Sequence, residues 1–156
     1  MPSYHQILVP VDGSPSSEKA LDEAIRLAQL TGARLRLLHV VDELGYVNGF
    51  ETAVNYLNAI IPLMRVAGEK LLAHDRKKAS DKGVAVDSVL IDEGPGRICE
   101  QVAEQARLAR ADLIVLGSHG RRGIGRMLLG SDAEQIVRHA TVPVLVVRAS
   151  EDSVPA

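Results

Sequence analysis

Residues 113–131 read LIVLGSHGRRGIGRMLLGS. The four apolar residues 113–116 predict a buried strand, and residues 133–139, just beyond the stretch, have the periodicity of a helix. The segment between strand and helix carries five glycines and three arginines. Glycine lets the backbone approach an anion closely, and a helix N-terminus offers unpaired N–H groups at the positive end of its dipole. The stretch therefore predicts a site for a phosphate or a nucleotide.

Size and composition are those of one globular domain. The chain has 156 residues, of which 46% are hydrophobic and 24% charged, enough for a packed core. We expect one domain over residues 1–148 and a flexible tail over residues 149–156. The net charge of −2 argues against a general binder of nucleic acid or of anionic membranes, because both need a broad positive field.

Cysteine content and hydropathy point to the cytoplasm. The single cysteine, Cys99, cannot form an internal disulfide, which is typical of a reducing compartment. We see neither a signal peptide nor an apolar run long enough to span a bilayer. An aromatic content of 3% disfavours sites that stack flavins or single-stranded nucleic acid.

Apolar runs alternate with helical patterns along the whole chain. Ser14 suits the N-cap of the first helix and Pro15 its first position, while Gly32 suits its end. Pro62 lies inside the second helical region, where we expect either a kink or a helix start, after a loop over residues 42–55. The predicted strands cover residues 7–11, 35–41, 84–91, 113–116 and 142–147, and the other helices lie near residues 98–108 and 133–139.

This alternation predicts an α/β fold. Short strands that are apolar on both faces indicate a doubly wound five-stranded parallel sheet, Rossmann-like or flavodoxin-like, with helices on both faces. Ligands of such sheets bind at the carboxyl ends of the strands. Asp12, the region around Val40 and the loop after Gly117 should therefore lie at one edge of the molecule.

Two common phosphate motifs do not fit. Residues 125–131 have the glycines and the serine of a Walker A loop but lack its lysine, and that loop is expected after the first strand. A dinucleotide fingerprint also belongs after the first strand, where this chain has only Asp12, Gly13 and Ser14.

What does fit is Gly117, two residues, Gly120, nine residues, then Gly130 and Ser131. Together with VPVDGS at residues 9–14 and VPVLVV at residues 142–147, this pattern resembles the universal stress protein family over about residues 5–148. The resemblance implies the ATP-binding type of that family, a five-stranded doubly wound sheet and a homodimer.

The same resemblance implies roles for individual residues. Asp12 would contact the ribose, and Val40 would meet adenine through its backbone. Asp132 departs from the family pattern, and its carboxylate would either repel a triphosphate or help to hold a metal. Pro10 and Val11 would line the nucleoside wall, Leu116 and Gly117 would lie under the sugar, and Gly120, Arg121, Arg122, Gly130, Ser131 and Asp132 would surround the phosphates.

Several of these residues also have purely structural explanations. Asp12 can cap the first helical turn, and Ser131 can cap the fourth helix while it binds a phosphate. For His119 we favour local packing over catalysis, and we expect Cys99 in the core. Asp92, at a strand end, can bind a metal or face solvent in a turn.

Four functions remain open on these grounds. The first is an ATP-binding stress-response or signalling module that takes ATP, ADP or AMP with Mg²⁺ and has at most weak hydrolysis, since no general base is evident. The second is a dedicated nucleotide-using phosphotransferase. The third is a receiver-like switch with Asp12 and Asp92 as its acids. A dimeric scaffold that binds no nucleotide is a further alternative.

The last predicted strand favours self-association. It begins at Val142 and ends at Val147, and Pro143 near its start is typical of an edge strand. An exposed apolar edge invites pairing, so we expect a homodimer through this strand.

Overall fold

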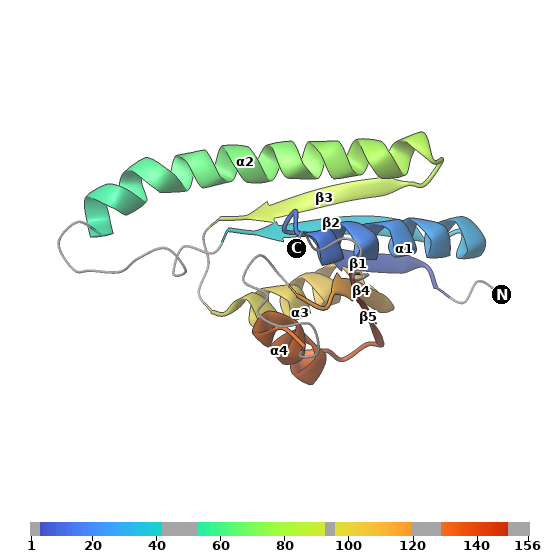
Figure 1. Ribbon diagram of the computed structural model, residues 1–156. Coiled ribbons are helices and arrows are strands. Elements are labelled where there is room, and N and C mark those ends of the chain that lie inside the picture. Colours follow the sequence, from blue (N-terminus) through green and yellow to red (C-terminus); the bar gives the residue numbers. More distant parts are fainter. Residues whose placement is uncertain (1–3, 42–52, 93–95, 120–128, 150–156) are drawn as a thin grey trace.

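The computed structural model describes residues 4–41, 53–92, 96–119 and 129–149. The elements are, in chain order, β1 (Gln6–Pro10), α1 (Pro15–Thr31), β2 (Arg34–Val40), α2 (Ala53–Asp81), β3 (Val86–Ile91), α3 (Ile98–Ala109), β4 (Leu113–Gly117), α4 (Ser131–His139) and β5 (Val144–Val147). The strands pair in parallel in the order β3-β2-β1-β4-β5. This confirms the predicted doubly wound α/β fold, with the strand order of the Rossmann type (Figure 1).

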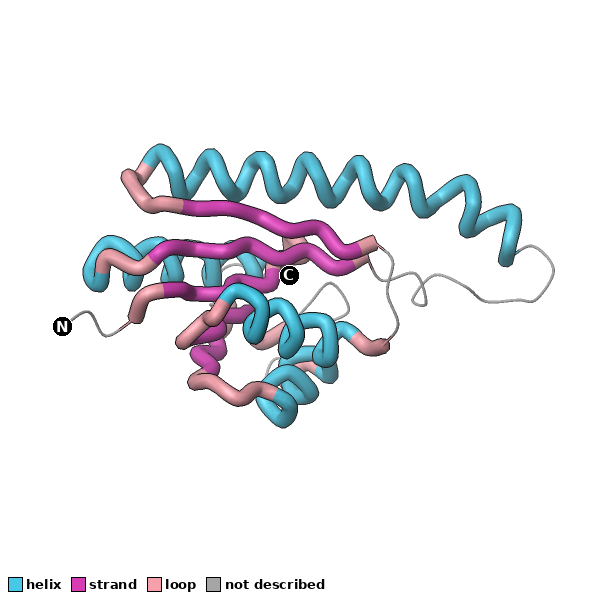
Figure 2. Tube along the Cα trace, turned by 180° about the vertical axis from the view of Figure 1, so that it is seen from behind, coloured by secondary structure: helices cyan, strands magenta, loops and turns pink. Residues whose placement is uncertain are grey.

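Two apolar layers hold helices on both faces of the sheet. Ile7 and Val9 of β1 belong to the cluster that packs against α1 and α2, whereas Leu8 belongs to the cluster under α3 and α4. The period-2 alternation of strand side chains separates the layers in this way. Figure 2 shows the same arrangement from behind, with the sheet between the two pairs of helices.

Helix α1 begins and ends where the sequence predicts. The Ser14 hydroxyl accepts a hydrogen bond from the Ser17 N–H (3.3 Å), and Pro15 occupies the first turn. Gly32 ends the helix with φ +77°, a left-handed conformation that favours glycine, and its N–H donates to the Ala28 carbonyl (2.8 Å).

Helix α2 starts earlier than the sequence predicts. It starts at Ala53, so the loop expected up to residue 55 is too long, and Pro62 lies inside the helix rather than at its start. Helix α2 packs onto the sheet further along, where Leu72 (2% exposed) and Ala79 are buried. Figure 1 shows its N-terminal turns bending away from the axis of the remainder, as expected near a proline that cannot donate a hydrogen bond.

Other boundaries shift by one or two residues. Strands β1 and β2 each start one residue earlier than predicted, and β3 and β5 each start two residues later. Helix α4 starts at Ser131 with Gly130 as its N-cap and no capping side chain, so the prediction that Ser131 caps this helix is wrong.

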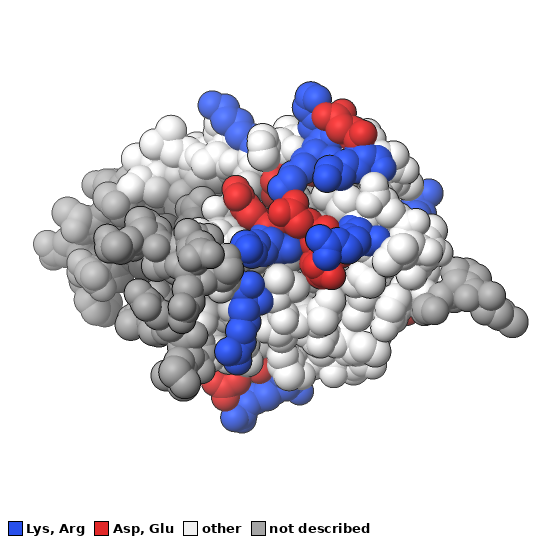
Figure 3. All heavy atoms as spheres, turned by 45° about the vertical axis from the view of Figure 1, so that its right-hand side comes forward, with Lys and Arg blue, Asp and Glu red and all other residues white. Residues whose placement is uncertain are grey.

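The surface mixes charges of both signs. Basic and acidic side chains lie next to one another on the face in Figure 3. Ion pairs between described residues include Lys78 with Asp22 (2.6 Å) and Arg36 with Asp87 (2.9 Å). No helix in the described part of the chain is long and apolar enough to cross a membrane.

Candidate functional site

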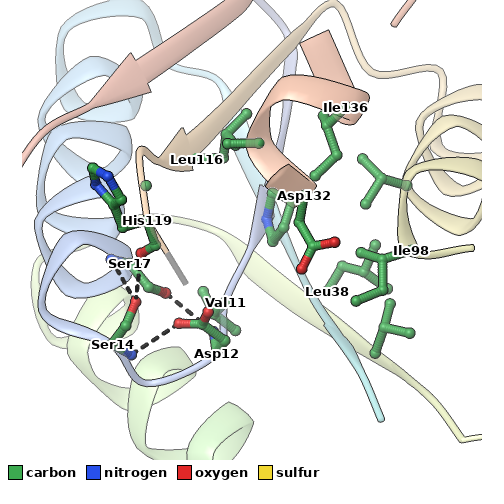
Figure 4. Close-up of a pocket in the computed structure, with 15 residues that line it drawn as sticks. Val11, Asp12, Ser14, Ser17, Leu38, Ile98, Leu116, His119, Asp132 and Ile136 are labelled. Carbon is green, nitrogen blue, oxygen red and sulfur yellow. Dashed lines mark hydrogen bonds between the residues drawn. The ribbon is translucent and has the colours of Figure 1, made fainter. Parts of the chain in front are cut away.

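A pocket lies at the carboxyl ends of β1, β2 and β4, beside α3 and α4 (Figure 4). It holds about 580 Å³ of space, which includes part of the open solvent at its mouth. It is lined by Pro10, Val11, Asp12, Ser14, Ser17, Leu38, Val40, Ile98, Val102, Leu116, Gly117, His119, Asp132, Ala133 and Ile136. Chain segments far apart in sequence therefore meet where the strand–helix alternation predicted a ligand.

The turn between β1 and α1 forms the polar wall. The carboxylate of Asp12 accepts a hydrogen bond from the Ser14 N–H (2.8 Å), and the Asp12 N–H donates to the Ser17 hydroxyl (3.1 Å). Both serines are buried, with 6% and 5% of their surface exposed. These bonds fix the conformation of the turn after β1. They hold the Asp12 carboxylate at the edge of the pocket.

His119 joins the end of β4 to the start of α1. Its carbonyl accepts hydrogen bonds from the hydroxyls of Ser14 (3.3 Å) and Ser16, and its N–H faces the Ser16 hydroxyl at 3.3 Å. In Figure 4 the ring turns toward α1, away from Asp132. Its Nδ1 lies 3.1 Å from the Ser118 hydroxyl, whereas its buried Nε2 has no hydrogen-bond partner within the described ranges. The backbone of His119 thus has a structural role.

Ser118 links the same wall to the rest of the sheet edge. Its N–H donates to the carbonyl of Val147 in β5 (2.9 Å), and its own carbonyl accepts from the N–H of Gly130 (2.7 Å). One peptide segment after β4 therefore contacts α1, β5 and the N-cap of α4.

Gly117 allows the end of β4 to lie very close to the start of α1. A Cβ atom at this position would lie 2.6 Å from the Ser16 Oγ and 2.7 Å from two backbone atoms, the Ser16 carbonyl carbon and the Ser17 nitrogen. Such distances are far inside van der Waals contact, so only glycine fits where β4 passes the first turn of α1.

The opposite wall is apolar. Leu38 and Val40 come from β2, Ile98 and Val102 from α3, and Ile136 from α4. Leu38 and Val102 are each 1% exposed, so they belong to the core as much as to the pocket. On the other face of β2, His39 Nδ1 lies 2.8 Å from the Val11 carbonyl. An apolar wall facing a polar one suits a ligand with a flat apolar ring and a polar remainder.

The charges at the pocket are negative. Asp12 and Asp132 line it, and Figure 4 shows the Asp132 carboxylate directed into the space between the two walls. No Lys or Arg lines the pocket among residues 4–41, 53–92, 96–119 and 129–149. Asp132 and Glu134 both lie in the first turn of α4, where acids interact favourably with the helix dipole.

The predicted site residues divide into three groups. Pro10, Val11, Asp12, Val40, Leu116, Gly117 and Asp132 all line the pocket. Gly130 and Ser131 stand next to Asp132 at the start of α4 but are not among the lining residues. Gly120, Arg121 and Arg122 lie outside the described residues, as do residues 42–52 of the predicted loop and most of the predicted tail.

Sequence reasoning did not assign several lining residues to the site. Ile98, Val102 and Ile136 look like ordinary core positions of helices, and Leu38 looks like an ordinary core position of a strand. A usable signal was their place in the fold: Ile98 opens α3 and Ile136 is on α4, the two helices that cover the strand ends bearing Asp12 and Gly117. Ser17 lies one helical turn after Ser14, so the N-cap predicted at Ser14 already indicated that Ser17 lies beside it.

The topology argues against the receiver-like alternative. That fold places the third strand beside the first, whereas here β1 pairs with β2 and β4, and β3 is the outer strand. Asp92 therefore follows an edge strand, where it forms an ion pair with Arg65 rather than facing solvent unpaired. No cluster of three or more His, Cys, Asp or Glu suited to a metal occurs within the described ranges.

Comparison with known proteins identifies the sequence family. The family model described as "Universal stress protein family" matches residues 3–148. The curated protein "Universal stress protein MJ0531" of Methanocaldococcus jannaschii is 34% identical over 145 residues, which cover 93% of this chain and 82% of that protein.

Solved structures agree on the fold. The structure of hypothetical protein MJ0577 superposes with a TM-score of 0.80 at 27% identity, covering 95% of this chain and 98% of that one. A universal stress protein solved in complex with cAMP superposes with a TM-score of 0.65 at 25% identity, covering 94% and 98%.

Proposed function

Because the chain belongs to the universal stress protein family, we propose that it is a nucleotide-binding module of stress response or signalling. Its ligand is an adenine nucleotide, ATP, ADP or AMP, bound with Mg²⁺ where a polyphosphate is present. The observation that carries this proposal is the pocket at the ends of β1, β2 and β4, which brings together seven of the residues expected at a nucleotide.

The two walls of the pocket suit the parts of such a ligand. The apolar wall with Val40 and Ile98 accepts the adenine ring, and Asp12 on the polar wall accepts hydrogen bonds from ribose hydroxyls. The phosphates then extend toward Gly130 and Ser131, next to a segment that supplies three arginines in the sequence. The carboxylate oxygens of Asp12 and Asp132 are of the ligand type that Mg²⁺ prefers.

Relatives support the ligand class. One solved universal stress protein is a complex with cAMP, an adenine nucleotide, and its fold covers 94% of this chain. Within the family, therefore, this fold accommodates an adenine nucleotide.

We further propose a single nucleotide-binding domain over residues 1–148 that forms a homodimer through the last strand and hydrolyses ATP slowly, if at all. β5 supports the dimer because it is an edge strand whose Leu145 is 38% exposed. A dedicated phosphotransferase and a dimeric scaffold without nucleotide are the competing functions.

The test measures nucleotide binding directly. Purified protein is denatured and any released nucleotide is identified by chromatography and mass spectrometry, and ligand-free protein is then titrated calorimetrically with adenosine, AMP and Mg-ATP. Val40→Trp fills the apolar wall and should abolish binding of all three ligands. Leu108→Trp, at a position 56% exposed on α3, is the matched control and should bind normally.

The outcomes separate the competing functions. Adenine nucleotide bound by the wild type and the control but not by Val40→Trp supports the proposal. Rapid turnover of ATP points instead to the phosphotransferase. A correctly folded wild type that binds no adenine compound in any form overturns the proposal and favours the scaffold.

A further inference from the structure

We propose that His39 positions Asp12 for the ribose of the ligand, and that it does so from the face of the sheet opposite the pocket. His39 does not line the pocket, whereas its neighbours Leu38 and Val40 on β2 do. Its effect passes through the peptide that joins Val11 to Asp12. The inference rests on the proposed function, since the ribose contact of Asp12 belongs to that function.

The first step is the hydrogen bond of the His39 ring. Strand β1 ends at Pro10, and Nδ1 of His39 lies 2.8 Å from the carbonyl oxygen of Val11, the first residue beyond the strand. A carbonyl oxygen can only accept a hydrogen bond, so Nδ1 carries a proton and donates it. A neutral His39 ring is therefore the tautomer with its proton on Nδ1.

The second step is that the same peptide unit is also held from the helix side. The N–H of Asp12 shares a planar peptide unit with the Val11 carbonyl, and it donates to the Ser17 hydroxyl in α1 at 3.1 Å. This peptide cannot rotate without loss of one of the two bonds. The Asp12 side chain branches directly from it, and its carboxylate accepts from the Ser14 N–H at 2.8 Å. The bond from His39 thus helps to set where that carboxylate lies.

The third step is the packing of α2 on the ring. A Cβ atom at Gly68 would lie 2.6 Å from Cδ2 and 3.1 Å from Nε2 of His39, and 2.7 Å from Cδ1 of Leu90 in β3. The Cδ2–Nε2 edge of the ring therefore meets the helix backbone, while Nδ1 meets the Val11 carbonyl. Contact on one edge and a hydrogen bond on the other leave the ring little room to turn.

The test compares two variants of similar shape, only one of which keeps the donor. His39→Asn retains an N–H donor bonded to Cγ, and His39→Leu has a methyl group there. Adenosine is the ligand because it carries ribose but no phosphate. We expect His39→Leu to raise the Kd for adenosine about tenfold, because the Val11 carbonyl loses this donor, and His39→Asn to stay within about threefold of the wild type. Circular dichroism and urea denaturation check that both variants are folded.

A second ligand separates positioning from packing. Dideoxyadenosine lacks both ribose hydroxyls, so it gains nothing from a correctly placed Asp12 carboxylate. We expect His39→Leu to change its Kd by less than about twofold. A histidine that only supports α2 would instead affect the binding of both nucleosides alike.

Nitrogen NMR of the wild type checks the hydrogen bond without any ligand. At a pH where the His39 ring is neutral, we expect its proton on Nδ1, and a proton on Nε2 would overturn the inference. Equal Kd values of the two variants for adenosine, or equal losses for both nucleosides, would overturn it as well while the proposed function stands. A folded wild type that binds neither nucleoside refutes the proposed function, and the inference with it.

Discussion

Gly117 and Ser16 approach each other so closely that a Cβ atom on the glycine would lie 2.6 Å from the serine Oγ. Two further contacts at 2.7 Å are with backbone atoms of Ser16 and Ser17. Backbone atoms cannot rotate away as a side chain can. The pocket wall and the first turn of α1 are therefore assembled around the missing side chain of one glycine.

Gly117→Ala should destabilise the fold and distort the pocket. Overpacking of this kind costs about 1–3 kcal/mol, measured as a lower free energy of unfolding in urea. Adding Ser16→Ala removes only the hydroxyl contact and leaves both backbone contacts, so the double variant should not recover wild-type stability. Full recovery would show that the hydroxyl alone limits the space.

The Arg36–Asp87 pair across β2 and β3 should make stability depend on acid pH. The two residues face each other in register and form two hydrogen bonds of 2.9 Å, and the hydrogen bond from Arg36 lowers the pKa of the Asp87 carboxyl. A lowered folded-state pKa stabilises the fold above the ordinary Asp pKa, and this contribution disappears as pH falls through the folded value.

We therefore expect Asp87→Asn to lower the free energy of unfolding by about 0.2–1 kcal/mol at pH 7, a small effect because the pair is partly exposed. At low pH the stability of the variant should differ less from that of the wild type. Urea denaturation of both proteins from pH 7 down to pH 3 measures the difference. A gap that stays constant over this range would contradict the assignment.

Asp75 on α2 should behave in the opposite way. Its side chain is buried, with 5% of the residue exposed, and burial raises its pKa although the hydrogen bond with His74 works against this. A raised folded-state pKa favours the fold below the ordinary Asp pKa, and the benefit is lost as pH rises through the folded value. Asp75→Asn should therefore increase the free energy of unfolding at pH 7.

A second variant, at the neighbouring exposed residue His74, tests what sets the pKa of Asp75. His74→Gln removes the hydrogen bond that lowers the pKa of Asp75, so in that variant the carboxyl should titrate at a higher pH than in the wild type. NMR titration of the carboxyl carbon measures both proteins. A carboxyl that titrates at the ordinary Asp pKa in the wild type would refute this account.

Leu145→Lys tests the dimer. This residue lies on the edge strand β5 and is 38% exposed, and a lysine on an edge strand discourages pairing with a second strand. We expect the wild type to sediment as a dimer and the variant as a monomer with the same helical content. Leu30→Lys, at a position 78% exposed on α1, controls for a surface lysine and should stay dimeric.

The sequence predicted the architecture well because local signals agreed along the chain. Ser14, Pro15 and Gly32 each have the residue type that their place in the α1 caps requires. The alternation of strands and helices then placed Asp12 and Gly117 at the same sheet edge, and both line the pocket.

The predictions failed or fell short where tertiary contacts decide. Pro62 left open a kink or a helix start, and only the structure decides between them: α2 continues through Pro62 and packs onto the sheet further along, at Leu72 and Ala79. Leu38 and Val102 could not be assigned to the pocket, because a side chain that lines an apolar wall has the same residue type as one in the core. Their place in the fold, not their chemistry, makes them part of the site.

The peptide segment at Ser118 has a thermodynamic consequence. Its N–H is bonded to Val147 of β5, its carbonyl to Gly130 at the start of α4, and the adjoining His119 carbonyl to the serines of α1. A displacement of this segment cannot occur at one of these contacts alone. Whatever shifts the equilibrium position of the edge strand must shift that of the pocket by the same coupling free energy, and the reverse holds equally. For the proposed dimer through β5, ligand binding and dimer formation are therefore expected to affect each other equally. The apparent affinity for the ligand should then depend on the protein concentration.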